Sequence, residues 1–247
     1  MLSIIIPVLN EDQIIEKLLF HLKENSSGEN DIEVIIVDGG STDNTRDLIK
    51  DFSKQTSTPE KSQNVKKRIS FQLFTSEKGR AKQMNYGAKQ ASSESLYFLH
   101  ADSFPPKNYD TFILSEINKG NIAGCFRMKF DSNHWWLKLA GWLTRFKWKG
   151  CRGGDQSLFI SKKLFNEIGG FDESYIIYED NVLINELNKR KSFIVIPHSL
   201  TTSARRYKEF GIWRLQYHFW AIHLKKWLGA NADGLYAYYS KNISKTQ

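Results

Sequence analysis

The sequence predicts an α/β protein built on a mostly parallel central sheet with helices on both faces. Four short apolar or β-branched runs (SIIIP, EVIIVD, ISFQLF and SLYFLH) lie in the first part of the chain, with helical patterns between them. Three of these runs are too continuously apolar for a sheet with one wet face, which indicates buried strands. Alternating strands and helices are typical of parallel βαβ units, so we expect a three-layer sandwich.

The elements of the first half follow from the spacing of apolar residues. The predicted strands are Ser3–Pro7, Glu33–Asp38, Ile69–Phe74 and Ser95–His100. A first helix is predicted to start with Asn10 as its N-cap, because apolar residues fall on one stripe at Ile14, Ile15, Leu18, Leu19 and Leu22. A second helix follows Ser41-Thr42-Asp43, and a third runs from Gly79 to about Ala91. Residues Asp51–Arg68 are polar and aperiodic from Ser53 on, which predicts an exposed loop.

The second half is predicted to extend the same sheet as a mixed α/β arrangement. Strands are expected at Ile122–Phe130, Ser157–Ile160 and Phe193–Ile196, and a glycine turn at Gly153-Gly154. Helices are expected at His134–Lys149, from about Asp180, at Gly211–Leu228 and at Ala232–Lys241.

The composition is that of an ordinary globular protein, and its net charge favours an anionic partner. Lysine and arginine total 35 against 27 acids, and the net charge of +8 favours a nucleotide phosphate, nucleic acid or an acidic membrane face. Cys125 and Cys151 lack metal-type spacing, so free thiols in a reducing compartment are expected, with one disulfide as the alternative. The N-terminus lacks the features of a signal peptide, and no run reaches the roughly 18 apolar residues of a membrane span, so the expected location is cytoplasmic.

Polar side chains follow three of the predicted strands, at the point where each strand ends. These residues are Asn10 and Glu11 after the first strand, Asp38 before Gly39-Gly40-Ser41, and His100, Asp102 and Ser103 after the fourth. In an open parallel sheet, ligands bind beyond the carboxyl ends of the strands. Each residue alone could have a structural role, as a cap or a loop residue, but three such groups on one edge predict a binding site.

Several ordered motifs run along nearly the whole chain. They are PVLNE (Pro7–Glu11), VDGGSTDNT (Val37–Thr45), GRAKQMNYGA (Gly79–Ala88), LHADS (Leu99–Ser103), GGDQSLFISKKLFNEIGGFDE (Gly153–Glu173), Glu179-Asp180 and TTSARR (Thr201–Arg206). Together they resemble the family 2 glycosyltransferases with a GT-A fold. The closing TSARR is similar to a small bacterial subgroup, the radical-SAM/selenodomain-associated transferases.

The resemblance implies transfer of a single sugar, with inversion, from a nucleoside-diphosphate sugar to an acceptor hydroxyl. It implies one GT-A domain over residues 1–247, with a nucleotide-binding half at 1–104, an acceptor and catalytic half at 105–210, and C-terminal helices at 211–247. The family's base and ribose contacts map to Pro7, Asn10, Glu11 and Asp38. Gly39 and Gly40 let the backbone approach the ligand closely, and Arg80 can add a cation beside the N-terminus of its helix. For Arg80, a solvated helix residue is an equal alternative on sequence alone.

LHADS stands at the position of the family's DXD motif. Asp102 matches the last aspartate, which implies a ligand for Mn²⁺ or Mg²⁺ that bridges the diphosphate. Ala101 lies at the middle position, and His100 replaces the first aspartate, so one anionic ligand is lost. For His100, a structural role is favoured over metal ligation, as a histidine at the strand end whose hydrogen bonds are made within the protein. A ribose contact is a further alternative.

Glu179-Asp180 matches the ED motif that supplies the catalytic base in inverting members. Asp180 is the implied base and Glu179 the second choice, while the alternative is that both simply begin a helix, where acids are favoured. Gly154 and Asp155 are implied to lie at the transferred sugar.

Arg205 and Arg206 stand where many processive relatives carry a Gln-x-x-Arg-Trp motif. Two arginines here are expected to clamp the diphosphate and to compensate for the missing aspartate. The absence of that motif and of spanning helices argues against a processive polysaccharide synthase.

Two segments, His134–Lys149 and Gly211–Leu228, interleave tryptophan and other aromatics with lysine and arginine. This composition is typical of interfacial helices, which would allow peripheral membrane contact and a lipid-linked acceptor. The favoured alternative is that the aromatics pack these helices onto the sheet or form a homodimer contact.

Two other functional classes remain open. A sugar-nucleotide-binding protein with weak or no catalysis is favoured if the replacement of aspartate by His100 reflects a loss of catalytic activity. A nucleic-acid binder is disfavoured, because the basic residues are scattered and form no recognised motif.

Overall fold

The computed structural model describes residues 1–57, 69–146 and 157–243, and these residues contain a mixed eight-stranded sheet. The strands are β1 (Leu2–Val8), β2 (Ile32–Asp38), β3 (Ile69–Thr75), β4 (Ser95–Phe98), β5 (Ser103–Phe104), β6 (Ala123–Phe130), β7 (Leu158–Ser161) and β8 (Ile194–Thr202). The helices are α1 (Ile15–Asn25), α2 (Thr45–Ser57), α3 (Arg80–Gln90), α4 (Tyr109–Asn118), α5 (Trp135–Leu143), α6 (Lys162–Glu167), α7 (Glu179–Lys189), α8 (Arg205–Phe210), α9 (Ile212–Trp227) and α10 (Ala232–Asn242).

The sheet has the order β3-β2-β1-β4-β7-β6-β8-β5 and is mostly parallel. The β1–β2, β1–β4, β2–β3 and β6–β8 pairs are parallel, whereas β7 is antiparallel to both of its neighbours and β5 is antiparallel to β8. The predicted parallel core and its mixed extension by the second half are therefore confirmed.

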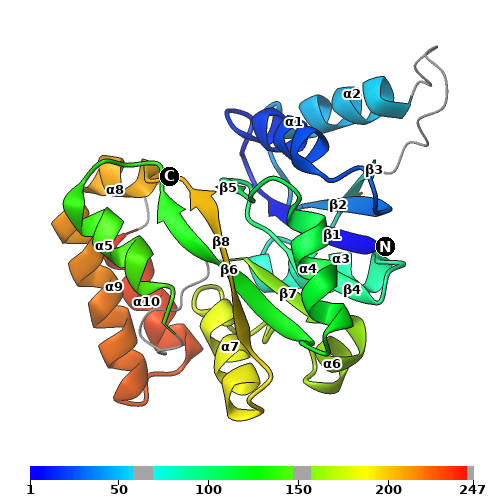
Figure 1. The fold of residues 1–247 in the computed structure, drawn as a ribbon. Helices are drawn as coiled ribbons and strands as arrows, with labels where there is room; N and C mark the ends of the chain where they lie inside the picture. The colour runs from blue at the N-terminus through cyan, green and yellow to red at the C-terminus, as the bar shows by residue number, and fades with distance from the viewer. Residues whose placement is uncertain (58–68, 147–156, 244–247) are drawn as a thin grey trace.

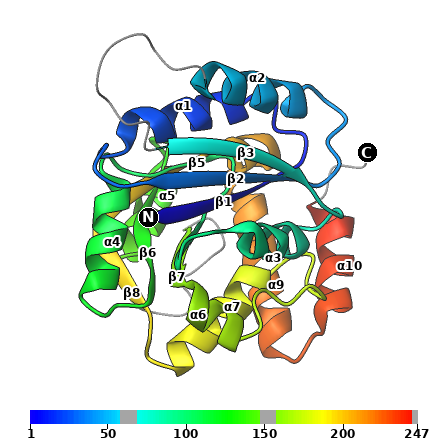
Figure 2. The same ribbon diagram turned by 90° about the vertical axis from the view of Figure 1, so that its right-hand side faces the viewer.

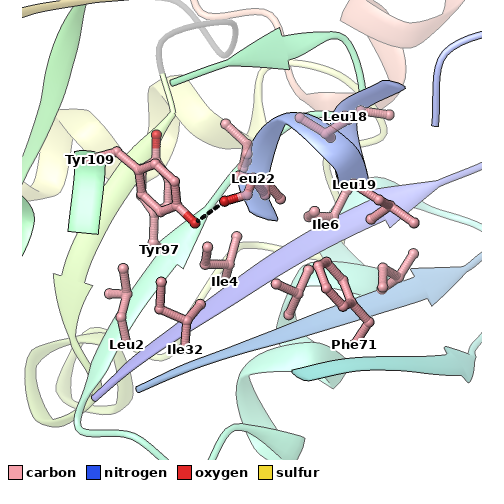
Figure 3. Close-up of a cluster of buried hydrophobic side chains, with 14 of the residues drawn as sticks. Leu2, Ile4, Ile6, Leu18, Leu19, Leu22, Ile32, Phe71, Tyr97 and Tyr109 are labelled. Atoms are coloured by element: carbon pink, nitrogen blue, oxygen red, sulfur yellow. Dashed lines mark hydrogen bonds between the residues drawn. The ribbon is translucent and has the colours of Figure 1, made fainter. Parts of the chain in front are cut away.

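Helices cover both faces of the sheet, as Figures 1 and 2 show. Alternate residues of β1 point to opposite faces: Leu2, Ile4 and Ile6 pack with α1, α2 and α4, and Ile5 packs with α3 and α6. Figure 3 shows the first of these clusters, where the Tyr109 hydroxyl donates a hydrogen bond to the carbonyl of Leu22 at 3.2 Å. The three-layer sandwich is confirmed.

Helix α3 lies unusually close to the sheet because Gly87 has no side chain. A Cβ atom at this position would lie 2.5 Å from Cγ2 of Ile5, which no side chain tolerates without displacement. The close approach brings the start of α3 to the carboxyl ends of β1 and β2.

A third cluster of buried side chains lies away from the sheet, among α5, α8, α9 and α10 (Figure 1). Its buried members are Leu137, Ala204, Tyr207, Leu215, Ile222, Leu235 and Ile243. None of the helices in the described part of the chain is both long and apolar enough to cross a membrane.

Three local predictions are wrong. The helix expected at His134–Lys149 ends at Leu143, because α5 spans Trp135–Leu143. Asn10 is not an N-cap: α1 begins after Ile14, and Asn10 lies in a turn with φ of 55°. The polar segment from Ser53 is not all loop either, since α2 continues to Ser57. The Ser53 and Thr56 hydroxyls donate back to the carbonyls of Ile49 and Phe52, and Phe52 is buried. The rest of the expected loop lies outside the described residues.

Candidate active site

The site forms where the parallel strands β1, β2 and β4 end at one edge of the sheet. Val8 of β1 is in register with Asp38 of β2, and Ile5 is in register with Phe98 of β4. Gln83 of α3, which is almost completely buried, donates from Nε2 to the carbonyl oxygens of Val8 at 2.8 Å and Val37 at 2.7 Å. This side chain holds the two strand ends and the start of α3 together.

The loops after β1 and β2 are joined by side-chain hydrogen bonds. The backbone amide of Asn10 donates to Oγ of Ser41, and the amide of Thr42 donates to Oδ1 of Asn10, both at 2.9 Å. The amide of Glu11 donates to Oγ1 of the buried Thr45 at 2.8 Å. The backbone of Glu11 is thereby fixed, and its carboxylate remains available for contacts across the edge.

Asp38 is completely buried, and its carboxylate stabilises the loop that follows it in the chain. Its carboxylate accepts hydrogen bonds from the amides of Gly40 and Ser41 at 3.1 Å, and Nε of Arg46 lies 3.7 Å away. Gly40 has φ of +94°, a conformation that favours glycine, and a Cβ on Gly39 would lie 3.0 Å from Gln83. These contacts give Asp38 and the two glycines a structural role, so their nucleotide contacts, like that of the buried Pro7 in β1, stay predictions.

Arg205 connects the second half of the chain to this edge. Its Nη2 lies 3.1 Å from Oε2 and 3.4 Å from Oε1 of Glu11. Partial burial lowers the pKa of Arg205, but the negative charges of Glu11 and Asp102 outweigh it and raise the pKa above the ordinary value. The carbonyl of Asp102 accepts from the amide of Ser203 at 3.1 Å, so the end of β8 lies against the loop after β4.

The structure separates the two adjacent arginines that were expected to act together. Nη2 of Arg206 donates to the Tyr239 hydroxyl at 2.9 Å, and its guanidinium lies over the rings of Tyr239 and Phe219. Arg206 is therefore directed at α9 and α10, whereas Arg205 is directed at Glu11.

A second charged group forms where α7 begins. Nη1 of Arg80 lies 3.1 Å from Oε1 of Glu179 and 3.8 Å from Oδ2 of Asp180. Nε2 of His100, at the end of β4, also lies 3.8 Å from Oδ2 of Asp180. The ED pair thus lies beside the HADS loop and the start of α3, and Arg80 is not merely a solvated helix residue.

The two carboxylates of this pair differ in exposure. Glu179 is completely buried, and within the described residues its oxygens accept no hydrogen bond, so Arg80 is the cation that offsets its charge. The side chain of Asp180 is 12% exposed, which leaves it accessible from the site.

Comparisons with known proteins identify the family. The family profile described as glycosyl transferase family 2 matches residues 3–171, more than half of the chain. The chain belongs to glycosyl transferase family 2.

Solved structures agree on the fold. Staphylococcus aureus TarS 1-349 in complex with UDP-GlcNAc superposes with a TM-score of 0.63 at 17% identity, over 82% of this chain and 58% of that chain. The mannosyltransferase PcManGT from Pyrobaculum calidifontis, in complex with GDP-Man and Mn²⁺, superposes with a TM-score of 0.65 at 16% identity, over 100% of this chain and 65% of that chain. The predicted GT-A fold is therefore confirmed.

Two curated relatives share more sequence identity with this chain than these solved structures do. In each case only part of the relative's length aligns with the chain. A Methanococcus voltae dolichyl N-acetyl-alpha-D-glucosaminyl phosphate 3-beta-D-2,3-diacetamido-2,3-dideoxy-beta-D-glucuronosyltransferase is 30% identical over 57% of this chain and 37% of its own length. A PGL/p-HBAD biosynthesis glycosyltransferase of Mycobacterium bovis is 27% identical over 73% of this chain and 66% of its own length. The subgroup indicated by TSARR stays a prediction.

The donor set of this family 2 site fits a cation that is shared with a phosphate ligand. Within the described residues, no group of three or more histidine, cysteine, aspartate or glutamate side chains could hold a metal ion. Asp102 offers one carboxylate, and Mg²⁺ is usually bound through one or two carboxylates together with substrate phosphates. Among the described residues, Asp102 would thus hold a divalent ion that shares its ligands with the diphosphate.

Some predicted site residues lie outside this geometry. Gly154 and Asp155 fall outside the described residues. Ala101 is buried in the loop between His100 and Asp102. A hollow of about 470 Å³ beside α6 and α7 contains none of the predicted site residues.

Sequence reasoning missed two residues of α3 whose side chains hold other segments of the chain against this helix. One is Gln83, described above. The other is Asn85, whose side chain donates from Nδ2 to the Phe171 carbonyl and accepts at Oδ1 from the Phe171 amide, both at 2.9 Å. For Gln83 a signal was present, because it is a polar residue on the stripe of α3 that also carries Ala81, Met84 and Ala88.

Proposed function

We propose that this protein is an inverting glycosyltransferase that moves one sugar from a nucleoside-diphosphate sugar to an acceptor hydroxyl. The observation that carries the proposal is the 3.8 Å approach of the Asp180 carboxylate to His100 at the end of β4. A carboxylate from α7 thus lies at the strand edge where α/β folds bind nucleotides.

In the proposed reaction, Asp180 is the general base. Its carboxylate takes the proton of the acceptor hydroxyl while the hydroxyl oxygen forms a bond to the anomeric carbon of the donor. The bond between that carbon and the diphosphate oxygen breaks, and the nucleoside diphosphate leaves with the electron pair. Glu179 is less suited to this role, because it is completely buried against Arg80.

The leaving diphosphate is the proposed partner of Arg205 and of a divalent cation that Asp102 would hold. Arg205 already lies 3.1 Å from Glu11 and interacts with the charge of Asp102. A guanidinium pairs well with phosphate oxygens. When bound at Asp102, Mn²⁺ or Mg²⁺ would neutralise charge on the departing group.

The relatives suggest which substrates to test. The structural neighbours bind UDP-GlcNAc and GDP-Man, so uridine and guanosine diphosphate sugars are the proposed donors. The name of the Methanococcus voltae relative gives it a dolichyl-phosphate-linked sugar as acceptor, which favours a lipid-linked acceptor here. The single-domain division at residues 104 and 210, the cytoplasmic location and a homodimer stay predictions.

A sugar-nucleotide-binding protein without turnover is the second candidate, favoured by His100 in place of an aspartate. Labelled UDP- and GDP-sugars, incubated with Mn²⁺ and candidate acceptors, distinguish the two. We expect release of the nucleoside diphosphate by the wild type and a loss of about 100-fold or more in Asp180→Asn, with donor binding retained. Glu186→Gln, a partly exposed position on the same helix, is the control. Donor binding without turnover by the wild type would support the second candidate.

A further inference from the structure

Helix α9 is apolar on two faces. Leu215 and Ile222 on its inner face are buried in the third cluster. Its outer face carries a stripe with alternating spacings of four and three residues: Trp213 (51% exposed), Tyr217 (63%), Trp220 (51%), Leu224 (55%) and Trp227 (81%). Residues at this spacing lie on one side of a helix. An amphipathic helix that needed only its own protein core would carry polar residues there.

Helix α5 extends this apolar surface. Trp135 (60% exposed), Leu139 (39%) and Trp142 (47%) follow the same spacing on its outer side. The ring of Trp213 lies 5.8 Å from that of Trp135 and 5.4 Å from that of Trp136, so the two stripes meet. We name the combined surface the aromatic face: Trp135, Leu139, Trp142, Trp213, Tyr217, Trp220, Leu224, Trp227 and the adjoining Leu228. Helices α5 and α9 lie side by side in Figure 1.

The lysine and arginine side chains of α5 and α9 have no acidic counterpart on the same two helices. Lys138, Arg145, Arg214 and Lys225 are exposed on or next to the same two helices. The sequence has no aspartate or glutamate between Asp131 and Asp155, or between Glu209 and Asp233. A contiguous exposed apolar surface usually marks an interaction site, and the exposed lysine and arginine side chains on these two helices add positive charge to this one.

This charge pattern disfavours a second copy of the chain as the occupant. A two-fold interface uses the same surface on both subunits, so the cations of α5 and α9 would face like charges without an acid on either helix. An anionic lipid surface offers the complementary charge. Tryptophan and tyrosine favour the headgroup level of a bilayer, and lysine and arginine beside them pair with anionic headgroups.

We propose that the aromatic face docks the protein on the surface of an anionic membrane. The apolar side chains insert at the headgroup boundary, and the flanking cations contact lipid phosphates. This inference does not depend on sugar transfer, because its test measures binding alone. Helix α8, which begins at Arg205, leads directly into α9, so a docked aromatic face would hold the candidate site close to the lipid surface.

Vesicle flotation tests the proposal with the full chain. Vesicles of phosphatidylcholine mixed with phosphatidylglycerol are compared with vesicles of pure phosphatidylcholine. We expect the wild type to float with the anionic vesicles only. Leu224→Ser with Trp227→Ser, two side chains that are more than half exposed, should abolish flotation. Lys138→Glu with Arg214→Glu should weaken binding by more than about thirtyfold, since losing each basic residue near the surface costs about 1 kcal/mol and the two new carboxylates are repelled by anionic lipid.

A matched control removes exposed apolar side chains elsewhere. Phe20→Ser with Ile122→Ser, from α1 and the start of β6, should float like the wild type. Thermal unfolding of each variant identifies any that fail to fold, and the charge-reversal pair changes only exposed side chains. The proposal is overturned if the wild type stays at the bottom with both vesicles, or floats equally with pure phosphatidylcholine. It is also overturned if the control pair loses flotation, or if sedimentation shows a dimer that dissociates in Leu224→Ser with Trp227→Ser.

Discussion

Nη2 of Arg205 lies 3.1 Å from Oε2 of Glu11, although 194 residues separate them in the chain. The contact joins the loop after β1 to the start of α8, which follows the end of β8. Together with the contacts of Asp180 to Arg80 and His100, it brings residues of both halves of the chain to one edge of the sheet. The proposed donor site depends on this arrangement.

Arg205 and Arg206 offer a matched pair of variants. Arg205→Gln should weaken the binding of a nucleoside diphosphate about tenfold or more, because a hydrogen bond to a charged group is worth about 1.5–3 kcal/mol. Arg206→Gln should leave that affinity unchanged, because its guanidinium contacts Tyr239 and Phe219. Calorimetric titration measures both. Equal losses in the two variants would contradict the separate placement of the two arginines.

Arg80 is predicted to stabilise the fold through Glu179. Arg80→Gln would remove the cation that lies 3.1 Å from a completely buried carboxylate. Because the Arg80 side chain is 43% exposed, we expect a loss of only about 2 kcal/mol in unfolding free energy. Adding Glu179→Gln should restore part of this loss, since the buried charge is then absent. Urea denaturation measures the three proteins. An unchanged midpoint for Arg80→Gln would show that the pair contributes nothing.

The first half of the fold was predicted well because burial and periodicity agree there. The strands β1, β2 and β4 are buried along their whole length, and a short, continuous apolar run between turn residues is typical of such a strand. From the strand ends alone, Glu11, Asp38 and Asp102 were expected on one edge of the sheet. The family resemblance, rather than spacing, pointed to Asp180.

Other features depend on tertiary contacts that spacing does not encode. Asn10 has the residue type of an N-cap, but its side chain accepts from Thr42 in a neighbouring loop. Arg205 and Arg206 are identical in type and adjacent, and only the packing of α8 against α9 and α10 separates them. For α9 the sequence left membrane contact open beside packing onto the sheet or a homodimer contact, because a helix with two apolar faces gives no signal for which face is inside.

Glu33 provides a test of stability against pH. Burial raises the pKa of this carboxyl, but hydrogen bonds from Ser3, Ser92 and Ser93 outweigh it and hold the pKa below 4.5. The folded state therefore binds the proton less readily than the unfolded chain. The stabilisation is present above about pH 4.5 and is lost as the pH falls through the lowered folded pKa.

Glu33→Gln should reduce the unfolding free energy at neutral pH by about 1–3 kcal/mol. It should also show a smaller decrease in stability between neutral pH and about pH 3 than the wild type. Urea midpoints across this range measure both effects, with the exposed Glu29→Gln as control. Parallel pH profiles for Glu33→Gln and the wild type would contradict the assignment.

The most direct test of the donor site is calorimetric titration of UDP and GDP into the wild type and Asp102→Ala, with and without Mn²⁺. We expect one of the two nucleotides to bind the wild type, more tightly with Mn²⁺ than without it, and Asp102→Ala to lose that metal-dependent gain. Failure of both nucleotides to bind the wild type would contradict the account. So would an affinity that is the same with and without Mn²⁺ and the same in the wild type and Asp102→Ala.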